Sequence, residues 1–523
     1  MKIIEKIWLR NFKKFEDEEI LFSDDLNILV GDNESGKSSI LKAIEIVVSG
    51  SQAKIANIGL ESLFNKNAIS KFMAGNKIIS LMPKIEIDLY IKDCSDFPEL
   101  YGRFNQGNKN ACGLHLVCEP DVDHSKDIDS ILKKGGSNFP FEFYKVGFFT
   151  FSGESYSSYR KYFNYLFIDG TEINNEYATK SYIKTIFESN SESAQRARLE
   201  NEYRKNKEEF KENFLSEVNK KIENFEFSVG SGLKSNLQAD LTIIEDGIAL
   251  ENKGKGRQCL IKTEFALQRV KQGKPLDTLL LEEPENHLSH GNMKKLVEKI
   301  RNSSAGQIFI STHSSFIASK LDLRKSILLS ASSGKALLFN GIPSDTADFF
   351  IKSPVNNVLE FCLSKKVILV EGNAEYILSD VMYEKVNGTS MEEDGVHLIS
   401  VGGTSFKRYL DIALRLGIRV AVIRDNDKNF KINCVDGFSD YANEKDINVF
   451  YDSDNSRSTL EIAVYEDNRE RCDEIFGEGR RSLSVKDYML SNKTEAAYKM
   501  LKEIGSSIKV PNYIERAVKW IKE

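Results

Sequence analysis

The sequence predicts an α/β protein built from two parallel-sheet units, and three observations support this fold class. Short apolar runs alternate with amphipathic, helix-like stretches, which is the pattern of strand–helix–strand units. A glycine-rich loop separates one early strand from the helix that follows it, and a second strand–helix series occupies the carboxy-terminal part. With 523 residues, the chain is too long for one ordinary core and predicts roughly two to four domains.

The elements of the first unit follow one another in order. Residues 2–8 and 26–30 are predicted strands, residues 31–38 form a loop, and the apolar periodicity of residues 40–48 predicts a helix. Further strand-like runs lie at residues 84–90, 113–117, 145–151, 279–281 and 307–310.

A densely charged segment between about residues 188 and 226 interrupts this series and predicts a long helix. Its apolar residues recur at spacings of three, four and seven, which places them in one stripe. They are Leu199, Tyr203, Phe210, Phe214, Val218, Ile222 and Phe225. Such a stripe is typical of a surface helix packed on its own domain and also of a helix that pairs with a second chain, and both alternatives stay open.

Composition narrows the classes of function. The 72 basic and 78 acidic side chains give a formal charge of -6, which excludes a uniformly basic nucleic-acid coat but allows a local basic groove. No apolar run approaches the roughly 18 residues that span a bilayer, so we expect no membrane association. Residues 1–6 lack the apolar stretch of a signal peptide. The seven cysteines form no CxxC pair, which predicts reduced thiols, no zinc site and a cytoplasmic protein.

The loop at residues 31–38 fits the pattern G-x-x-x-x-G-K-[ST] between a strand and a helix. Its glycines let backbone N–H groups turn toward phosphate, Lys37 can reach the β and γ phosphates, and Ser38 can bind magnesium. The positive end of the following helix favours the same anion. The sequence therefore predicts an ATP site formed by Gly31, Asn33, Glu34, Ser35, Gly36, Lys37, Ser38 and Ser39.

Two later strands end in residues that suit this site. The first ends at Glu282 and Glu283, which we expect to complete the Mg²⁺ shell and to orient or deprotonate the attacking water. The second ends near His313, which can sense the γ-phosphate. The alternatives are an acidic helix cap before Pro284 and a purely structural histidine.

The second unit begins beyond residues 353–357, where a proline and two asparagines interrupt the pattern. Strand-like runs at residues 367–370, 396–401 and 419–423 are separated by helix-like stretches at residues 376–386 and 406–416, which predicts a parallel α/β unit.

Carboxylates follow two of these strands. Glu371 and Glu375 come just after the first, and Asp425 and Asp427 follow the third. If the two strands are neighbours, the four side chains point to one place, and such hard oxygen ligands suit Mg²⁺ or Mn²⁺. A pair of such ions about 4 Å apart can activate water and stabilise the leaving oxygen of a phosphodiester. The alternative is a set of solvated acidic loops.

The first unit resembles the ATPase heads of the ABC superfamily in its SMC/RecF-like branch, both in the phosphate loop and in the opening residues 9–12. The resemblance implies that two heads sandwich ATP and that residues 254–258 form the signature loop. Lys255 stands there where serine is expected, and Glu282 replaces the more common aspartate. Lys255 therefore either supplies charge to the γ-phosphate or belongs to a merely structural loop.

The second unit resembles a Toprim domain, and Gly402 and Gly403 also fit that pattern. A head followed by Toprim resembles the OLD (overcoming lysogenisation defect) family of nucleases. By this resemblance Glu461 helps to hold a metal ion and Lys493 stabilises charge on the scissile phosphate, although the two could also form an exposed ion pair.

The resemblance implies an ABC-type ATPase domain at residues 1–165 and 235–352, a dimerising helical insertion at residues 166–234 and a Toprim nuclease domain at residues 358–523. We expect an ATP-regulated, metal-dependent DNA endonuclease or nickase, which acts as a homodimer or larger homo-oligomer in anti-phage defence or DNA processing. Two alternatives are an ATP-gated DNA clamp without cleavage and an effector that works with a partner protein or nucleic acid, for example in a retron system.

Overall fold

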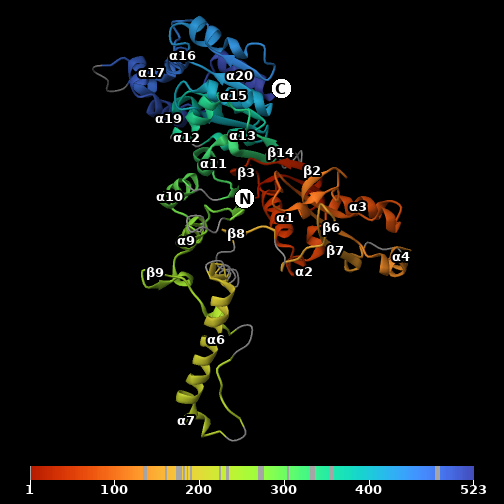
Figure 1. Cartoon of the computed structure of the whole chain (residues 1–523). Coiled ribbons are helices and arrows are strands. Elements are labelled where there is room, and N and C mark those ends of the chain that lie inside the picture. Colours follow the sequence, from red (N-terminus) through yellow and green to blue (C-terminus); the bar gives the residue numbers. More distant parts are fainter. Residues whose placement is uncertain are drawn as a thin grey trace. The chain divides into compact units, whose positions relative to one another are not determined.

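The computed structural model of the protein divides into two compact units (Figure 1). The first unit comprises residues 1–29 and 33–313, and the second comprises residues 30–32 and 314–523. The described residues are 2–133, 138–159, 162–171, 180, 183–184, 186–188, 191–222, 225–230, 235–268, 276–302, 306–329, 336–353, 357–477 and 483–523. Of the expected boundary at residues 353–357, residues 354–356 lie outside this set.

The first unit contains an antiparallel sheet in the order β2-β1-β4-β6-β5, with β7 also paired to β6. Its strands are β1 (Ile4–Phe12), β2 (Phe15–Leu21), β4 (Ile85–Ile91), β5 (Tyr101–Gly102), β6 (Ala111–Pro120) and β7 (Tyr144–Thr150). The helices α2 (Gln52–Ile58), α3 (Lys66–Ala74) and α4 (Ser125–Lys133) belong to the same part of the chain. A small core that includes Phe72, Ile128 and Phe139 packs α3 against α4.

The parallel strands of this unit run in the order β3-β12-β11-β8. They are β3 (Leu26–Gly31), β12 (Gln307–Ser311), β11 (Thr278–Glu282) and β8 (Tyr165–Asp169), with helices α1 (Lys37–Ser49), α9 (Lys255–Gln268) and α10 (His290–Arg301). The apolar run of β11 is buried almost throughout, as expected for a parallel strand covered on both faces. The predicted strand–loop–helix order around the phosphate loop is thus confirmed.

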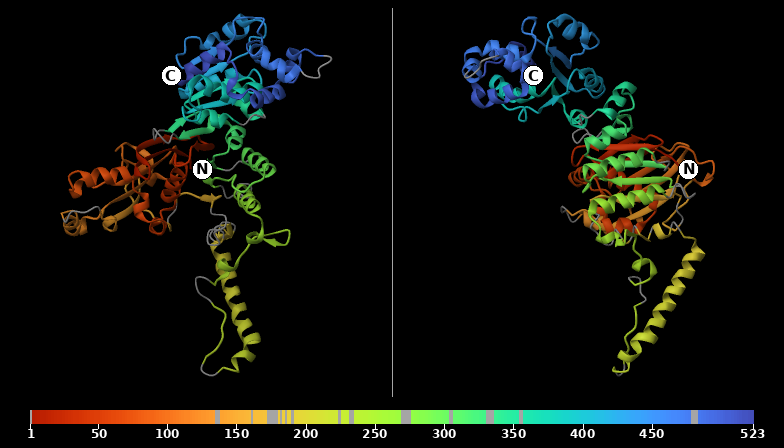
Figure 2. Two further views of the ribbon diagram at one scale, coloured as in Figure 1. Left: turned by 180° about the vertical axis from the view of Figure 1, so that it is seen from behind. Right: turned by 90° about the vertical axis from the view of Figure 1, so that its left-hand side faces the viewer.

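The charged segment forms an arm of helix and returning chain, shown in yellow in Figure 2. Helix α6 (Ser193–Phe210) continues through one turn of π-helix (Lys211–Leu215) into α7 (Ser216–Asn219), and α8 (Leu237–Asp240) and the hairpin β9 (Ile244–Glu245)–β10 (Ile248–Ala249) follow. The predicted helix is too long, because Ile222 and Phe225 lie beyond α7. The reason is local: the Asn219 amide exchanges two hydrogen bonds with the backbone of Phe227, at 2.7 and 3.0 Å, and so holds the returning chain against the helix end.

The second unit is organised around a parallel sheet in the order β16-β15-β17-β18. The strands are β15 (Lys366–Val370), β16 (Val396–Ser400), β17 (Arg419–Ile423) and β18 (Ile447–Phe450). The helices are α14 (Asn373–Asn387), α15 (Phe406–Leu416), α16 (Leu460–Asp467), α17 (Arg469–Gly477), α18 (Val485–Ser491), α19 (Lys493–Glu503) and α20 (Asn512–Lys522). A core that includes Ile368, Leu378, Ala463, Met500 and Val518 joins β15 to four of these helices. The predicted parallel α/β unit is confirmed.

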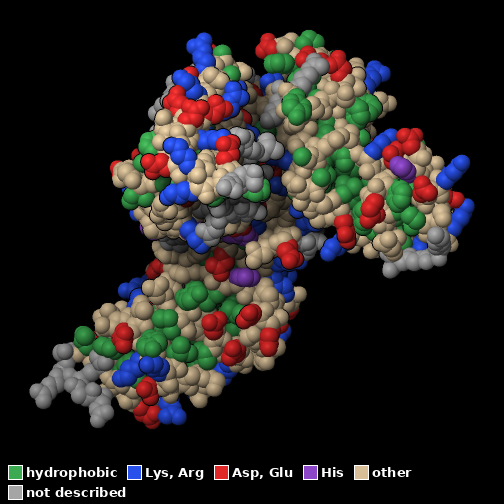
Figure 3. All heavy atoms as spheres, turned by 90° about the horizontal axis from the view of Figure 1, so that it is seen from below, with side chains coloured by type: hydrophobic (Ala, Val, Ile, Leu, Met, Phe, Trp, Pro, Cys, Tyr) green, Lys and Arg blue, Asp and Glu red, His purple; other side chains and the backbone are tan. Residues whose placement is uncertain are grey.

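The remaining elements precede this sheet in the chain. They are α11 (Ser315–Leu321), the antiparallel pair β13 (Ser326–Leu329) and β14 (Ala336–Leu338), α12 (Ser344–Lys352) and α13 (Val358–Leu363). No helix within the described part of the chain is both long and apolar enough to cross a bilayer. On the face shown in Figure 3, acidic and basic side chains are intermixed.

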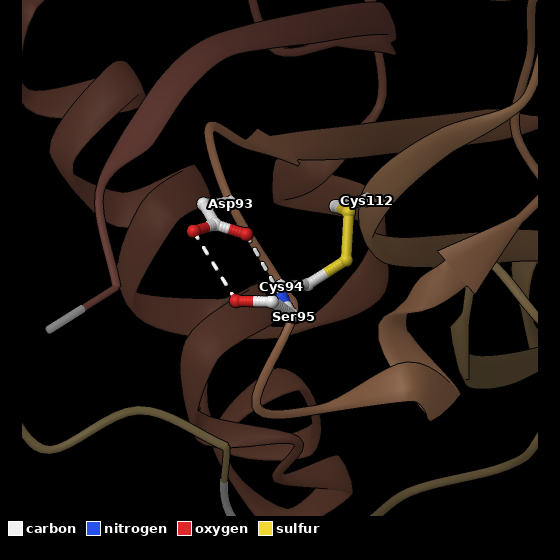
Figure 4. Close-up of a disulfide and its surroundings, with 4 residues drawn as sticks. All are labelled: Asp93, Cys94, Ser95 and Cys112. Atoms are coloured by element: carbon white, nitrogen blue, oxygen red, sulfur yellow. Dashed lines mark hydrogen bonds between the residues drawn. A yellow bond between two sulfur atoms is a disulfide. The ribbon is translucent and has the colours of Figure 1, made fainter.

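The expectation that all thiols are reduced is wrong for one pair. Cys94 and Cys112 form a disulfide with a Cα–Cα separation of 5.9 Å (Figure 4). The two residues are 18 positions apart, but Cys112 lies opposite Ile91 in the antiparallel pairing of β4 and β6, so the sheet brings Cys94 within reach. The other five cysteines are free and buried.

Candidate functional site

The phosphate loop leaves β3 at Gly31 and enters α1 at Lys37. Gly36 has φ 103, a left-handed conformation that favours glycine, and a Cβ there would lie 2.7 Å from the ring of Phe15. Glu34 also has a positive φ of 61, and its carbonyl accepts a hydrogen bond from Lys14 at 3.3 Å. Lys37 is buried, and its ammonium lies 3.5 Å from the Ser35 hydroxyl. The loop therefore has the backbone geometry and the cation that phosphate binding requires.

Glu282 ends β11 beside this loop. The hydroxyl of Ser38 donates a hydrogen bond to its carboxylate, which brings together the two residues predicted to complete a Mg²⁺ shell. Burial raises the pKa of Glu282, and the charges of Asp169 and Glu283 add to that rise. Asp169 lies at the end of β8, directly opposite Glu282 in the parallel register. These desolvated carboxylates fit a divalent cation, because a cation would restore the balance of charge.

The side chains of Glu283 and His313 lie together. The imidazole Nε2 lies 3.3 Å from Glu283 Oε1, and the amide of Asn286 donates to Glu283 Oε2 at 2.8 Å. Glu283 has a positive φ of 40, and its backbone N–H donates to the carbonyl of Ser311 in the neighbouring strand. Strained backbone of this kind is common at functional sites, where the surrounding structure holds a side chain in place.

Glu285 contacts the backbone at His313 and the residue before it. Its carboxylate accepts hydrogen bonds from the Thr312 hydroxyl at 2.5 Å and from the backbone N–H of His313 at 2.9 Å. Burial raises the pKa of Glu285. Glu285 therefore positions the turn that presents His313, a role that sequence spacing alone did not single out.

The residues that resemble a signature loop open helix α9. The guanidinium of Arg257 pairs with Glu245, and the amide of Gln258 donates to the carbonyls of Glu251 and Lys253. A Cβ at Gly256 would lie 2.3 Å from the carbonyl of His287, so only glycine fits there. Arg257 and Gln258 are thus engaged within the loop's own surroundings, whereas Lys255 is exposed.

In the second unit, β15 and β17 are parallel neighbours, and their carboxyl ends carry the predicted acidic residues. Glu371 follows β15, and its carbonyl accepts a hydrogen bond from Gly403, which lies after β16. Glu375 lies in the first turn of α14, Asp425 and Asp427 follow β17, and Glu461 lies in the first turn of α16. Lys493 begins α19.

Three carboxylates and one ammonium form what we call the inner cluster: Glu375, Asp425, Glu461 and Lys493. Lys493 Nζ lies 3.1 Å from Glu461 Oε2, and the backbone N–H of Leu460 donates to Asp425 at 2.9 Å. Burial raises the pKa of Asp425 to about 8, and the charges of Glu375 and Glu461 add to the effect. Burial likewise raises the pKa of Glu375. Burial opposes the charge on Lys493, yet the neighbouring carboxylates raise the pKa of its ammonium.

The other two predicted ligands form a separate outer pair, Glu371 and Asp427. The guanidinium of Arg424 lies between them: one amino group contacts Glu371, and Nη2 lies 2.9 Å from Asp427 Oδ2. Arg424 is itself almost fully buried. The structure therefore brings the six predicted nuclease residues to one end of the sheet but sorts them into two groups.

The inner cluster and the outer pair share the turn Asp425-Asn426-Asp427, which we call the Asp-x-Asp turn. Its middle residue connects this turn to the loop at residues 452–457. Asn426 is 1% exposed, and its amide donates to the carbonyls of Asp452, Asp454 and Arg457 at 2.8 to 3.3 Å. Its side-chain oxygen accepts the N–H of Lys428 at 2.9 Å. Asp427 and Lys428 both have left-handed φ values, 47 and 67, and Asn426 holds this strained turn closed.

The fit of a divalent ion can be judged from the buried oxygens. Within the described residues, no three His, Cys, Asp or Glu side chains already converge as a finished metal cage. Glu461 Oε1 is nevertheless buried without a hydrogen-bond donor from the described part of the chain, whereas Oε2 contacts Lys493. A buried, unsatisfied carboxylate oxygen beside two further desolvated carboxylates is costly. Mg²⁺ or Mn²⁺ would satisfy it, so the donor set fits such an ion.

Sequence reasoning missed four residues of these sites: Asp169, Glu285, Arg424 and Asn426. Asp169 ends an apolar strand and could have been found by the same rule as Glu282. Glu285 lies two positions after Glu283, Arg424 directly precedes Asp425, and Asn426 lies between Asp425 and Asp427. Their importance comes from contacts with distant residues, which the spacing of the motifs does not indicate.

Comparison with known proteins finds two different families in the two parts of the chain. A family described as AAA ATPase domain (AAA_15) matches residues 1–318, and an overcoming lysogenization defect protein-like TOPRIM domain matches residues 363–427. The chain is 23% identical over 447 residues to Endonuclease GajA of Bacillus cereus (strain VD045), which covers 81% of this chain and 75% of that protein.

Two solved structures extend the comparison. The C-terminal region of the Xanthomonas campestris pv. campestris OLD protein is 22% identical, with a TM-score of 0.24 over 31% of this chain and 94% of its own. The SMC head domain from Thermotoga maritima is 16% identical, with a TM-score of 0.27 over 64% of this chain and 97% of its own. From the extent of the first family match and the position of the second, the chain belongs to the AAA_15 ATPase-domain family and joins that domain to a Toprim domain of the overcoming-lysogenisation-defect (OLD) type.

Proposed function

We propose that this protein is an ATP-regulated, divalent-metal-dependent DNA endonuclease or nickase that acts in anti-phage defence or DNA processing. The observation that supports it most is the inner cluster, in which three desolvated carboxylates share one lysine at the carboxyl edge of a Toprim sheet. A buried excess of carboxylate over cation is unfavourable in the metal-free protein and is relieved when divalent ions bind. The similarity to an endonuclease supports the same activity.

Each nuclease residue then has a chemical role. Glu375, Asp425, Asp427 and Glu461 hold the metal ions, and Glu371 is either a further ligand or a general acid/base. Bound metal ions supply Lewis acidity and a more acidic water. Lys493 is half exposed, with its ammonium already held by Glu461, so it can contact the scissile phosphate and neutralise the charge of the transition state.

In this proposal, ATP binding and hydrolysis in the first unit regulate DNA cleavage by the second. The phosphate loop from Gly31 to Ser39 holds the phosphates through its backbone and Lys37, while Ser38 and Glu282 hold Mg²⁺. Glu283 orients or deprotonates the attacking water, and His313, 3.3 Å from Glu283, responds to the γ-phosphate. The exposed Lys255 is available to contact the nucleotide of a second head.

DNA is the proposed substrate, and a homodimer or larger homo-oligomer is the proposed assembly, formed through the ATPase heads and the helical insertion at residues 166–234. The arm exposes Leu199, Phe210, Phe214 and Val218, an apolar set that favours pairing over isolation. We infer a cytoplasmic protein, which in a defence system would work alone or with a partner protein or nucleic acid, as in a retron.

A cleavage assay tests the proposal. Supercoiled and linear DNA are incubated with Mg²⁺ or Mn²⁺, with and without ATP. We expect nicking or cutting that requires metal, is lost in Asp425→Ala and leaves ATP turnover intact. Lys37→Ala is the matched variant for the other half: it abolishes ATP turnover and removes the ATP dependence of cleavage.

Two observations favour a second function. The outer pair is already engaged by Arg424, and no finished metal cage is present among the described residues. Both fit an ATP-gated, SMC/RecF-like DNA clamp whose Toprim unit does not cut. Nucleotide-dependent DNA binding by the wild type, without cleavage under any metal condition, would establish the clamp and refute the nuclease.

A further inference from the structure

Arg424 is an unusual neighbour for a metal site, because it adds a cation where the ligands should attract one. It follows β17 directly, and its backbone N–H donates to the carbonyl of Phe450 at 3.0 Å, which fixes the start of the side chain. The side chain is 8% exposed and lies across the ends of β17 and β15 to reach both carboxylates of the outer pair. The guanidinium is buried, whereas the side chains of Glu371 and Asp427 are 30% and 50% exposed, so one side of the outer pair stays open to solvent.

The charges of the two groups differ. Arg424 contacts two carboxylates, Glu371 and Asp427. Lys493 contacts Glu461, and its charge also interacts with Asp425 and Glu375, so one ammonium faces three carboxylates. The inner cluster therefore has more carboxylates for each cation, and it contains Glu461 Oε1, which lacks a donor within the described residues. The outer pair is already neutralised in part by a rigid cation at hydrogen-bond distance. A divalent ion that binds there must take the oxygens of Asp427 and Glu371 from the guanidinium.

The backbone favours this arrangement. Asp427 has a left-handed φ of 47, and its N–H donates to the carbonyl of Ser458 at 3.2 Å. Asn426 anchors the same turn through its buried amide. The turn therefore stays in place when Arg424 is replaced by a neutral side chain, so that a change in ion binding reports on charge rather than on loop collapse.

We propose that Arg424 is a built-in counter-ion, which holds Glu371 and Asp427 together in the metal-free protein and competes with a divalent cation for them. The inference rests on the proposed metal-dependent function and deepens it. It gives the two halves of the site an order: the inner cluster binds first, and the outer pair binds only when the cation displaces Arg424. Arg424 is thus a positioning residue that sets the metal concentration at which the site is completed.

Calorimetric titration of the full chain with MnCl₂, without nucleotide or DNA, tests the order of binding. The stronger sites of this unit are those lost in Asp425→Asn, and the weaker ones are those lost in Asp427→Asn. In Arg424→Gln we expect the weaker Kd to fall by about tenfold, which corresponds to roughly 1.4 kcal/mol, with the stronger Kd unchanged. Arg424→Lys retains the charge and keeps the weaker Kd near the wild-type value.

Thermal unfolding in EDTA provides a second readout and guards against a variant that folds poorly. Removing one partner of a buried pair leaves uncompensated charge, so Arg424→Gln lowers the Tm. Adding Asp427→Asn to Arg424→Gln removes that excess charge and raises the Tm again. Arg324→Gln is the matched control, since Arg324 also contacts two carboxylates, Asp322 and Asp348, and its loss leaves the Mn²⁺ isotherm unchanged.

Two results would overturn the inference. If Arg424→Gln leaves the weaker Mn²⁺ affinity unchanged or reduces it, Arg424 does not compete with the ion and instead helps to hold the ligands. If no Mn²⁺ binding depends on Asp425 or Asp427 in the wild type or in Arg424→Gln, both the metal-dependent function and this inference fail. A weaker site that appears only in Arg424→Gln supports the inference, because it shows that the guanidinium blocks the ion.

Discussion

At the residue scale, the Asp-x-Asp turn depends on an uncharged side chain. Asn426 is buried, and its amide hydrogens are used by three carbonyls of the loop at residues 452–457. Its oxygen accepts one further N–H, from Lys428. This one residue therefore aligns the turn that carries Asp425 and Asp427 with the loop that leads to Glu461.

Replacing Asn426 with aspartate tests this alignment. The new carboxylate faces carbonyl oxygens without a proton to donate, so we expect the free energy of unfolding to fall by about 2 to 3 kcal/mol. Denaturant unfolding in EDTA measures the change. Asn429→Asp is the matched control: Asn429 is exposed, and its oxygen already acts as the acceptor for Ile432, so the same substitution costs little there. Equal losses in the two variants would contradict the role of Asn426.

Asp425 makes stability depend on pH. Its folded pKa of about 8 lies well above the usual value of about 4 for aspartate, because burial and neighbouring carboxylates oppose its charge. The stability that comes from the protonated group is fully present below about pH 4 and is lost as the pH rises to about 8. Over this range the unfolded chain gives up its proton while the folded chain still holds it, so unfolding becomes easier.

Asp425→Asn mimics the protonated form and removes this dependence. In EDTA at pH 8 we expect the variant to unfold with a free energy at least about 1 kcal/mol higher than the wild type, since one unit of pKa shift corresponds to about 1.4 kcal/mol. The difference should shrink toward pH 4. Mn²⁺ at pH 8 should stabilise the wild type and not the variant. A constant difference across the pH range would show that Asp425 does not titrate in this window.

At the element scale, the helices α6 and α7 of the arm bury none of their own side chains. Phe210 and Phe214 stack on each other with ring centroids 5.2 Å apart, yet both are largely exposed. The returning chain is held to the helix mainly by polar contacts, such as Lys207 with the carbonyl of Gly230 and Tyr203 with Asp240. Phe210, Phe214 and their neighbours Leu199 and Val218 thus remain largely exposed, which is the pattern of an element that pairs with a second copy.

The double substitution of Phe210→Ser and Phe214→Ser tests this pairing. Because the two rings cover little of the chain's own surface, we expect an unchanged Tm at low protein concentration. Sedimentation velocity should show that the assembly dissociates at an about tenfold higher protein concentration than the wild type. This is the change expected when a buried apolar contact worth roughly 1.4 kcal/mol is lost. Tyr159→Ser, at a position that is 99% exposed, is the control. An unchanged assembly would assign the arm to another role.

At the scale of the whole molecule, two chemistries lie in separate compact units of one chain. The first contains Lys37, Glu282 and His313, and the second contains the inner cluster and the outer pair. Each site lies at the carboxyl ends of parallel strands, and each has buried carboxylates whose charge a divalent ion can balance. Both sites therefore offer hard oxygen ligands of the kind that divalent cations prefer.

Most of the fold follows from local pattern, and the sequence predicts it well. Buried parallel strands are continuous apolar runs that end where polar side chains begin, so β11, β12, β15 and β17 and the polar residues after them can be located without a structure. The phosphate loop is equally local, since its glycine conformation and following helix depend on adjacent residues. The end of the arm helix and the Cys94–Cys112 disulfide could not be located, because both depend on contacts across the fold.

Sequence pattern thus predicts which chemical groups the chain carries: a phosphate loop, an acidic strand end beside it and a second set of carboxylates suited to Mg²⁺ or Mn²⁺. Only the folded structure decides how those carboxylates are grouped. Asp425 and Asp427 are two positions apart, yet the left-handed turn and Asn426 direct one toward Glu375 and Glu461 and the other toward Arg424 and Glu371. The physical reason is that charge balance depends on distances between side chains from different elements, and motif spacing does not specify those distances.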